Sequence, residues 1–389
     1  MNIAFFSNYL SPHQIPFSDE MYRLLGEKYT FVSCEPYNTD RIKMGWEQEQ
    51  KPYELKSYLS DANYQKAKEL AATCDVMLWG SAKYEFIQIR KKSGKINIRY
   101  SERLFKEGFL SSIKKLDILR QIKFNLNTRS SNQYLFSASA YAPFDFLCSL
   151  GGFKKSYRWG YYPHTYYYSC EELREKKSDT NRVSILWTGR LIELKHPEVA
   201  ILLADGLQKK GIDFSFEIIG NGPLKSAIEE LIESRHLTNK VHLLGAMTPE
   251  NVRRHMEQSD FFIFSSDYNE GWGAVLNESL NSGCVVFCSD EVGSAHYLIK
   301  DGINGFLFNR KNIDDLVALM TDLINNPQKR VEIGEKAYET ISHLWSAQNA
   351  ANRFYEWCKS AIAGELIEYD EGPMSCAKIV VPKGRWWIR

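Results

Sequence analysis

Residues 269–283, with the sequence NEGWGAVLNESLNSG, constrain the fold of this chain more than any other stretch. A compact apolar run, 261–264, precedes the stretch, and a second apolar run, 284–288, follows it. Between them lie a Gly-Trp-Gly turn at 271–273 and a helical pattern over 274–281, which Gly283 can end. This order of strand, glycine loop, helix and strand predicts a βαβ unit with parallel strands.

Two carboxylates, Glu270 and Glu278, stand eight positions apart in this stretch. The rise between them is on the order of 10 Å, so they are poorly placed to act as an acid/base pair on one bond. They could instead hold two ends of one extended ligand, with an anionic group at the helix N-terminus between them. The alternative is that both are solvated glutamates on the surface.

Short apolar runs alternate with helix-like segments along the whole chain, which predicts βαβ units and parallel sheets in an α/β fold. The strand candidates of the first half are 3–7, 30–34, 76–79, 96–100, 135–137 and 144–149. Those of the second half are 183–188, 214–219, 241–244, 261–264 and 284–289. A last helix is expected over 347–363.

Polar loops follow several of these strands. Arg190 and Lys195 stand in a strand-to-helix loop, the usual place for a phosphate ligand. The sequence GNGP at 220–223 allows the backbone to approach a ligand closely. It is not a dinucleotide fingerprint, because Lys225 stands where the third glycine would be, and the chain has no P-loop motif.

His13 lies in the loop after the first strand, where a doubly wound fold binds ligands. It is a candidate general base or sugar hydrogen-bonding group, and the alternative is a structural loop residue.

A strongly basic segment covers residues 90–129, with twelve Lys and Arg against Glu102, Glu107 and Asp117. Apolar residues recur there at roughly helical spacing from Phe109 to Leu126. One interpretation is an amphipathic surface on an anionic membrane, and the other is a domain helix with solvated lysines outside. No nucleic-acid-binding module accompanies the charge, so a nucleic acid partner is not expected.

The eight cysteines are scattered without a CxxC pair, which favours reduced thiols over disulfides or a metal site. No run of about 18 apolar residues occurs. The first residues enter a strand pattern directly, without a basic segment or a long apolar run. We therefore expect a cytoplasmic protein, with possible peripheral attachment to the inner face of the cell membrane.

Residues 183–310 resemble the donor domain of a retaining glycosyltransferase of the GT-B fold, family 4 (glycosyl transferases group 1). The resemblance rests on six motifs in the family's order: GRL with a following lysine at 189–195, GNGP at 220–223, VHLLG at 241–245, EGWGAVLNE at 270–278, SGCVVFCSDEVGS at 282–294 and DGINGFLF at 301–308. The first half of the chain matches only in its general pattern.

The resemblance implies a role for each of the charged residues. Arg190 and Lys195 would neutralise the donor diphosphate, Glu270 would bind the hydroxyls of the donor sugar, and Glu278 would bind the ribose. The remaining residues would line the donor site, largely through backbone groups: Gly220, Gly222, Gly245, Met247, Gly271, Trp272, Gly273 and Ala274. The donor is a co-substrate, so we expect no cofactor and no metal.

The sequence departs from the family pattern in three places. The first-domain loop reads SNYLSPHQIP and lacks the usual glycine pair. Asn277 stands where the family is commonly apolar or small, and Glu291 and His296 flank Gly293-Ser294.

We therefore expect an α/β GT-B architecture of two Rossmann-like domains facing across a cleft. The expected parts are an acceptor-side domain at 1–175, a donor domain at 181–345, a helix at 346–365 that crosses back to the first domain, and a tail at 366–389. The expected reaction moves a sugar with retention from a UDP- or GDP-sugar to a hydroxyl of a glycan or lipid-linked acceptor, in bacterial surface polysaccharide synthesis. The alternatives are another sugar-nucleotide chemistry, such as an epimerase or a phosphorylase, and a non-catalytic sugar-nucleotide-binding protein at the membrane.

Overall fold

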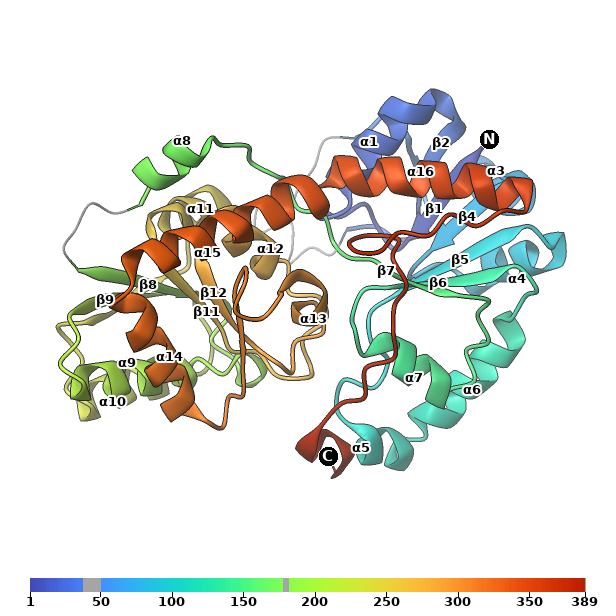
Figure 1. The fold of residues 1–389 in the computed structure, drawn as a ribbon. Helices are drawn as coiled ribbons and strands as arrows, with labels where there is room; N and C mark the ends of the chain where they lie inside the picture. Colours follow the sequence, from blue (N-terminus) through green and yellow to red (C-terminus); the bar gives the residue numbers. More distant parts are fainter. Residues whose placement is uncertain (38–49, 178–181, 389) are drawn as a thin grey trace. The chain divides into compact units, whose positions relative to one another are not determined.

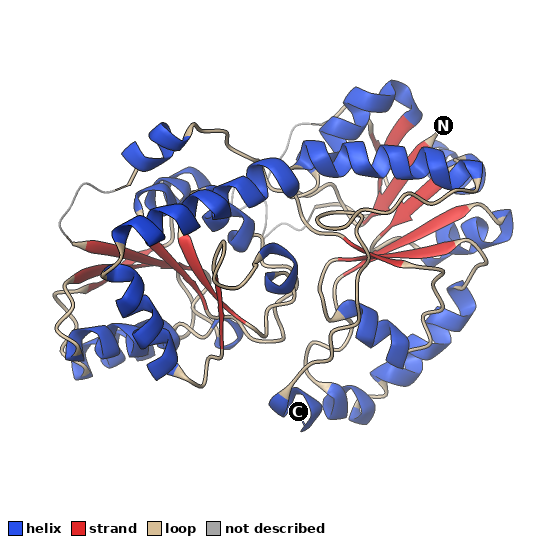
Figure 2. Ribbon diagram, in the orientation of Figure 1, coloured by secondary structure: helices blue, strands red, loops and turns tan. Residues whose placement is uncertain are grey.

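The computed structural model describes residues 1–37, 50–177 and 182–388. The chain divides into two compact units: unit 1 contains Met1–His164 and Trp345–Arg389, and unit 2 contains Thr165–Leu344. Each unit has one parallel β-sheet with helices packed on both faces, drawn red and blue in Figure 2. The predicted α/β class with two Rossmann-like parts is confirmed.

The sheet of unit 1 has seven parallel strands in the order β3-β2-β1-β4-β5-β6-β7. These are β1 (Ile3–Ser7), β2 (Tyr29–Ser33), β3 (Glu54–Lys56), β4 (Val76–Trp79), β5 (Ile96–Ser101), β6 (Gln133–Ser137) and β7 (Ser156–Arg158). The helices of this unit are α1 (Ile15–Leu25), η1 (Gly26–Lys28), α3 (Asp61–Thr73), α4 (Tyr84–Ser93), α5 (Phe109–Lys114), α6 (Asp117–Thr128), α7 (Ala142–Cys148), α16 (Ala347–Ala363) and η4 (Gly384–Ile388).

The sheet of unit 2 has six parallel strands in the order β10-β9-β8-β11-β12-β13. These are β8 (Val183–Thr188), β9 (Phe214–Ile219), β10 (Val241–Gly245), β11 (Phe261–Phe264), β12 (Val285–Ser289) and β13 (Phe306–Phe308). The helices are α8 (Cys170–Glu175), η2 (Glu193–Lys195), α9 (Glu198–Lys209), α10 (Lys225–Ser234), α11 (Pro249–Gln258), α12 (Val275–Asn281), α13 (Ala295–Leu298), α14 (Ile313–Ile324), α15 (Pro327–Glu339) and η3 (Thr340–Leu344).

The strand order of each sheet reverses once, between β1 and β4 in unit 1 and between β8 and β11 in unit 2. The central strands are buried along their whole length, as β11 and β12 show. Strands covered on both faces read as continuous apolar runs, which is why the sequence revealed them. The edge strand β10 instead alternates between buried Val241 and exposed His242.

One predicted strand is wrong, because residues 144–149 belong mostly to helix α7. Pro143 stands in the first turn of this short buried helix, where its fixed φ is tolerated. A short apolar run cannot be assigned to strand or helix from periodicity alone. The buried Asp145 carboxylate on this helix accepts hydrogen bonds from the backbone N–H groups of Leu104 and Phe105.

The C-terminal residues complete unit 1. Helix α16 packs beside α1, as Figure 1 shows. The Trp357 indole on α16 donates a hydrogen bond of 3.0 Å to the hydroxyl of Tyr157 on β7. In η4, the Trp386 indole donates one of 2.9 Å to the carbonyl of Phe105.

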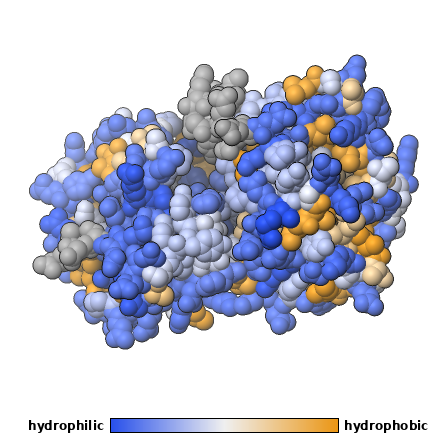
Figure 3. All heavy atoms as spheres, turned by 90° about the horizontal axis from the view of Figure 1, so that it is seen from above, coloured by the Kyte–Doolittle hydropathy of each residue, from blue (hydrophilic) through white to orange (hydrophobic). Residues whose placement is uncertain are grey.

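Hydrophilic residues dominate the face of the molecule in Figure 3, where apolar residues form scattered patches. Such scattered exposure is ordinary for globular proteins. Among the described residues, no helix is both long enough and apolar enough to cross a membrane.

Candidate active site

The candidate site lies in unit 2, in the loops that follow β8 and β11. These two strands are neighbours in the sheet and are paired from Ile185 to Leu186 with Phe261 to Phe262. The strand order reverses between them, and ligands of doubly wound folds bind beyond the carboxyl ends of strands at such a switch point. The loop after β8 carries Arg190 and Lys195, and the loop after β11 carries Glu270.

Lys195 and Glu270 form an ion pair at this switch point, with 2.5 Å between Nζ and Oε2. Their side chains are only 16% and 12% exposed, so water screens the pair weakly. The Lys195 ammonium also lies 5.4 Å from the ring centroid of Phe264, at the end of β11. The sequence placed the two residues on separate loops, and the structure brings their charges into contact.

Arg190 stands in the same loop as Lys195, and its side chain is exposed. The turn that holds it is ordered by neighbouring backbone groups. Gly189 N–H donates to the carbonyl of Ile219 at 3.0 Å, and Leu191 N–H donates to that of Asn221 at 2.9 Å. Arg190 is therefore a second cation of this loop, exposed to solvent and held at a fixed backbone position.

Glu278 lies on α12 and is half-buried. Burial raises the pKa of its carboxyl to about 7, and the nearby Arg253 guanidinium opposes part of that rise. Arg253, on α11, also donates hydrogen bonds of 3.2 Å and 3.0 Å to the carbonyls of Glu278 and Asn281. Neither Glu270 nor Glu278 is an exposed surface residue, so that interpretation of the pair is wrong.

The Gly-Trp-Gly turn is held from behind by side chains. Gly273 has a φ of 77°, and a Cβ at this position would lie 2.5 Å from the ring of Phe264. Trp272 is buried, and its indole donates a hydrogen bond of 2.7 Å to Oδ1 of Asn277. Ser294 donates to the Trp272 carbonyl. Asn277 therefore has a structural partner, and Gly271, Gly273 and Ala274 remain half-buried.

The two glycines of GNGP allow two loops to touch. A Cβ on Gly220 would lie 1.8 Å from the carbonyl oxygen of Gly189, and one on Gly222 would lie 2.4 Å from that of Leu191. Gly220 N–H also donates to the carbonyl of Gly245, at the end of β10. The two glycines therefore allow the close contact that orders the turn carrying Arg190, besides allowing the backbone to approach a ligand.

Gly245 and Met247 stand at the far end of this connected set of loops. Gly245 has a φ of 76°, with no atom within 4 Å of a built Cβ, and Met247 is half-buried before α11. Backbone contacts therefore connect the loops after β8, β9 and β10.

His13 belongs to unit 1, in the loop before α1. Its ring stacks on that of Tyr161 at 5.8 Å between centroids, and its carbonyl accepts a hydrogen bond from Tyr162 N–H. The other predicted site residues all belong to unit 2.

Several buried or half-buried polar residues of this site carried no sequence motif. Ser265, Asp267 and His196 connect the Lys195 loop to the Glu270 turn, and Arg253 holds the end of α12. The serine and aspartate follow an apolar strand directly, which is the one signal that could have drawn attention to them.

The sequence of unit 2 is similar to those of known glycosyltransferases. Residues 170–340 match the family model described as glycosyl transferases group 1. A segment of 165 residues is 28% identical to poly(ribitol-phosphate) α-N-acetylglucosaminyltransferase of Staphylococcus aureus strain COL, and it covers 42% of this chain and 33% of that protein.

A segment of 185 residues is 31% identical to the N-acetylgalactosamine-N,N'-diacetylbacillosaminyl-diphospho-undecaprenol 4-α-N-acetylgalactosaminyltransferase of Campylobacter jejuni, covering 48% of this chain and 46% of that protein. The chain therefore spans about a third to a half of the length of these curated relatives.

Solved structures extend the similarity to both units. The complex of Anabaena HepE with UDP has a TM-score of 0.66 at 14% identity, with 92% of this chain and 100% of that chain covered. The lipopolysaccharide outer core galactosyltransferase WaaB, in its apo form, has a TM-score of 0.64 at 18% identity, with 92% and 99% covered. This chain has the GT-B fold. Together with the family match, the fold supports a GT-B glycosyltransferase.

Proposed function

We propose that this chain is a retaining glycosyltransferase that moves a sugar from a nucleotide-sugar to a hydroxyl of a glycan or lipid-linked acceptor. The observation that carries the proposal is the weakly hydrated Lys195–Glu270 pair at the switch point of a unit that matches glycosyltransferases. A cation and a carboxylate placed together suit a ligand that has an anionic diphosphate next to a sugar with donor hydroxyls.

In this proposal, Lys195 and Arg190 stabilise the charge that develops on the diphosphate as it leaves. Glu270 accepts hydrogen bonds from the donor sugar, and Glu278 accepts them from the ribose. The bond from the anomeric carbon to the phosphate oxygen breaks, and the acceptor oxygen bonds to that carbon from the same face. The acceptor proton passes to the departing diphosphate, so no protein nucleophile takes part. Two cations supply the neutralisation, and we propose no metal.

UDP is the first donor nucleotide to test. Structures of Anabaena HepE contain UDP, UDP with glucose, and UDP-glucose, which supports a uridine nucleotide for this chain as well. The relatives named above act on poly(ribitol-phosphate) and on a diphospho-undecaprenol glycan, which supports an acceptor in surface polysaccharide synthesis. His13 is a candidate for binding that acceptor or the donor sugar, and the cytoplasm is the proposed compartment.

The proposal is tested with a panel of UDP-, GDP- and TDP-sugars, read by hydrolysis and transfer, and by calorimetry with UDP. We expect Lys195→Ala to weaken UDP binding about tenfold or more, since a charge-assisted hydrogen bond is lost. Lys210→Ala, at an exposed lysine just after α9, is the matched control and should bind like the wild type. Unchanged UDP affinity in Lys195→Ala, or intact transfer in both Glu270→Ala and Arg190→Ala, would contradict the assigned roles.

Two alternative functions predict different results when the protein is incubated with the donor. An epimerase would interconvert the donor sugar without an acceptor, so incubation with the donor alone separates it from a transferase. A non-catalytic binding protein would bind UDP but would turn over no donor of the panel.

We further propose that unit 1 attaches to an anionic membrane through α5 and α6. Three basic residues of the segment 90–129 do not contribute to such a surface, because Arg90, Arg99 and Arg103 are buried. Arg90 donates to the carbonyls of Cys74, Asp75 and Ile96. The surface charge is thus smaller than the sequence indicated.

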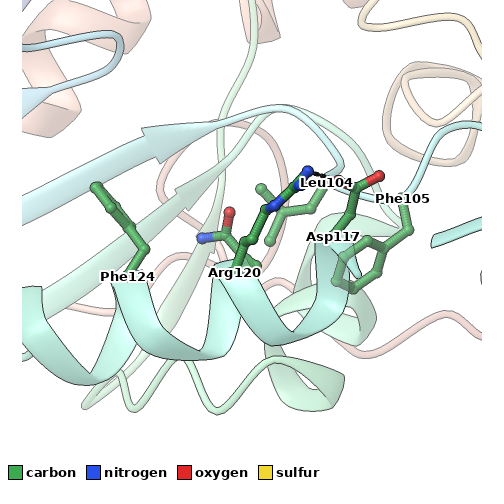
Figure 4. A pocket seen from close by; sticks show the side chains of 6 residues that line it. Leu104, Phe105, Asp117, Arg120 and Phe124 are labelled. Atoms are coloured by element: carbon green, nitrogen blue, oxygen red, sulfur yellow. Dashed lines mark hydrogen bonds and ion pairs between the residues drawn. The ribbon is translucent and has the colours of Figure 1, made fainter. Parts of the chain in front are cut away.

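The outer surface of α5 and α6 nevertheless combines exposed apolar and basic side chains. Five apolar side chains are between 38% and 61% exposed: Leu110, Ile113, Leu116, Leu119 and Leu126. The exposed basic residues among them are Lys114, Lys115, Arg120 and Lys123. A recess of about 410 Å³ on α6 is lined by Leu104, Phe105, Asp117, Arg120, Gln121 and Phe124. Arg120 pairs with Asp117 there at 3.2 Å, and Figure 4 shows the two side chains pointing toward each other. Leucines interleaved with lysines suit the interface of an anionic bilayer.

The membrane proposal is tested by sedimentation of the whole chain with vesicles of phosphatidylcholine, with and without phosphatidylglycerol. We expect binding only to the anionic vesicles, weakened by salt, and lost when Leu119 and Leu126 are both changed to serine. Leu59→Ser, at an apolar residue of unit 1 that is 63% exposed, should bind normally. Binding that persists in the double variant, or a dimer formed through this surface instead, would overturn the proposal.

A further inference from the structure

The loops that carry Lys195 and Glu270 are tied together behind the ion pair. The Ser265 hydroxyl donates a hydrogen bond of 2.7 Å to the carbonyl of Lys195 and accepts one of 2.9 Å from the Trp187 indole. Asp267 N–H donates to the carbonyl of Leu194 at 3.0 Å. These contacts hold the backbone of the two loops in register.

A side-chain bridge involving His196 is added to these backbone contacts. His196 follows Lys195 directly and has left-handed backbone angles, with φ 48° and ψ 56°. Its Nδ1 lies 2.7 Å from Oε1 of Glu198, and its Nε2 lies 3.5 Å from Oδ2 of Asp267. The imidazole is 20% exposed and the Asp267 carboxylate 5% exposed, so the contact between them is largely shielded from water, whereas the Glu198 side chain at the other end is 41% exposed.

Asp267 in turn shapes the turn that contains Glu270. Its Oδ1 accepts hydrogen bonds from the backbone and side-chain nitrogens of Asn269, at 2.8 Å and 3.0 Å. Its carbonyl accepts a hydrogen bond of 3.0 Å from Glu270 N–H. The position of the Asp267 carboxylate is therefore coupled to that of the Glu270 backbone.

We propose that His196 is a positioning residue for donor binding: held by Glu198 at the start of α9, it contacts Asp267 on the other loop and so keeps Lys195 and Glu270 in the geometry that receives the nucleotide-sugar. This inference rests on the proposed function of the Lys195–Glu270 pair. It adds a residue beside the pair that acts on the donor through Lys195 and Glu270.

The charges around His196 determine how the bridge responds to pH. Glu198 on α9 and Asp267 after β11 face its two nitrogens. Arg310, after β13, opposes the positive charge, and it is itself paired with Glu291 at 2.7 Å. Lys195, the residue before His196, is paired with Glu270. Burial lowers the pKa of His196, but the neighbouring carboxylates of Asp267 and Glu198 outweigh burial, so the pKa is raised.

The sign of the pH effect follows from the hydrogen-bonding capacity of the ring. The imidazolium can donate to both carboxylates, whereas the neutral ring can donate to only one. Both contacts are therefore favoured at low pH, and one of the two is lost as the pH rises through the raised pKa of His196. Donor affinity should fall over that same interval.

The test compares His196→Asn with His236→Asn in the whole chain. Asparagine tolerates left-handed backbone angles, and His236 is an exposed histidine of unit 2 with a φ of 55°, so the control makes the same change in a similar backbone. We expect His196→Asn to weaken UDP binding about tenfold and to raise KM for the donor more than it lowers kcat. The decline of affinity with rising pH should disappear in His196→Asn and persist in His236→Asn.

Asp267→Asn is the second variant, and thermal unfolding confirms that each protein is folded before it is assayed. We expect Asp267→Asn to lose the same pH dependence, because this change removes the other end of the bridge. A His196→Asn enzyme with wild-type affinity and a wild-type pH profile would refute the bridge and leave the proposed function standing. A wild-type chain that binds no nucleotide and turns over no donor would refute both.

Discussion

Glu278 should destabilise the ligand-free chain at neutral and alkaline pH, and Glu278→Gln should relieve that effect. Burial raises the pKa of its carboxyl from 4.5 to about 7, and Arg253 offsets only part of the rise. A carboxyl whose pKa is higher in the folded state binds more protons when folded. The free energy of unfolding therefore falls as the pH rises between the two pKa values, and it stays low above them.

The size of the effect follows from the two pKa values. The difference between 4.5 and about 7 corresponds to about 3 kcal/mol at pH values above both. Glu278 is half-buried, so solvent screens part of this, and we expect about 1–2 kcal/mol. For a unit of this size, that is a rise in Tm of roughly 2–8 °C for Glu278→Gln.

The assay is thermal unfolding of the wild type and of Glu278→Gln over a pH series from about 5 to 8. The two Tm curves should meet at the acid end and separate as the pH rises, with the variant more stable. UDP affinity, measured in parallel, should be lower in the variant, because the proposed contact to the ribose is weakened. A gain in stability with a loss of binding is the pattern expected of a residue kept for its ligand.

Glu257→Gln is the control with the opposite sign. Burial alone would raise the pKa of Glu257, but hydrogen bonds from Tyr168, Arg253 and Lys176 outweigh it and hold the pKa below its usual value. The stability that this lowered pKa contributes is present at pH values above the pKa of Glu257 in the unfolded chain, and it is lost as the pH falls. Glu257→Gln should therefore lower the Tm most at neutral pH. A Glu278→Gln variant that is less stable than the wild type at pH 8, or that shows no pH dependence, would refute the reasoning.

Two further predictions concern the backbone and the core of the site. Gly220→Ala should weaken UDP binding and lower the Tm, because the new Cβ would lie 1.8 Å from the Gly189 carbonyl oxygen and would displace the turn that carries Arg190. Gly211→Ala is the control for a residue with positive φ, because a Cβ at that position meets no atom within 4 Å. Asn277→Leu should cost about 1–3 kcal/mol in chemical denaturation, because the buried Trp272 indole loses the Asn277 acceptor. A double-mutant cycle with Trp272→Phe, in which the two costs are less than additive, would confirm this cause.

Much of the fold could be predicted because the central strands are buried on both faces. The predicted strands 183–188, 214–219 and 261–264 have the bounds of β8, β9 and β11. Helix α16 was predicted with the correct ends, since Ser346 caps its start and Gly364 ends it in a left-handed conformation. The three-residue strands β3 and β7 were missed, because they are too short to show a periodic pattern.

The candidate site was predictable only where its residues stand in motifs. Arg190, Lys195, Glu270 and the glycines follow strands in recognisable loops. The contact between Lys195 and Glu270 depends on β8 and β11 being neighbours, and strand order is not written in local sequence. His196 has no pattern that separates it from a solvated loop histidine, because its two carboxylate partners lie on different elements.

Under the proposed function, the Lys195–Glu270 pair would explain how an unliganded site can be ready for a charged substrate. An isolated ammonium or carboxylate with so little exposure would be costly in the free protein, and each ion here compensates the other. Donor binding then exchanges one set of charged contacts for another: in the proposed complex, the diphosphate takes up the lysine and the sugar hydroxyls take up the glutamate. Removal of either residue leaves the other charge uncompensated before any ligand arrives. The loss of stability in Lys195→Ala or Glu270→Ala is therefore a measure of this preorganisation, and it is separate from the loss of donor contacts.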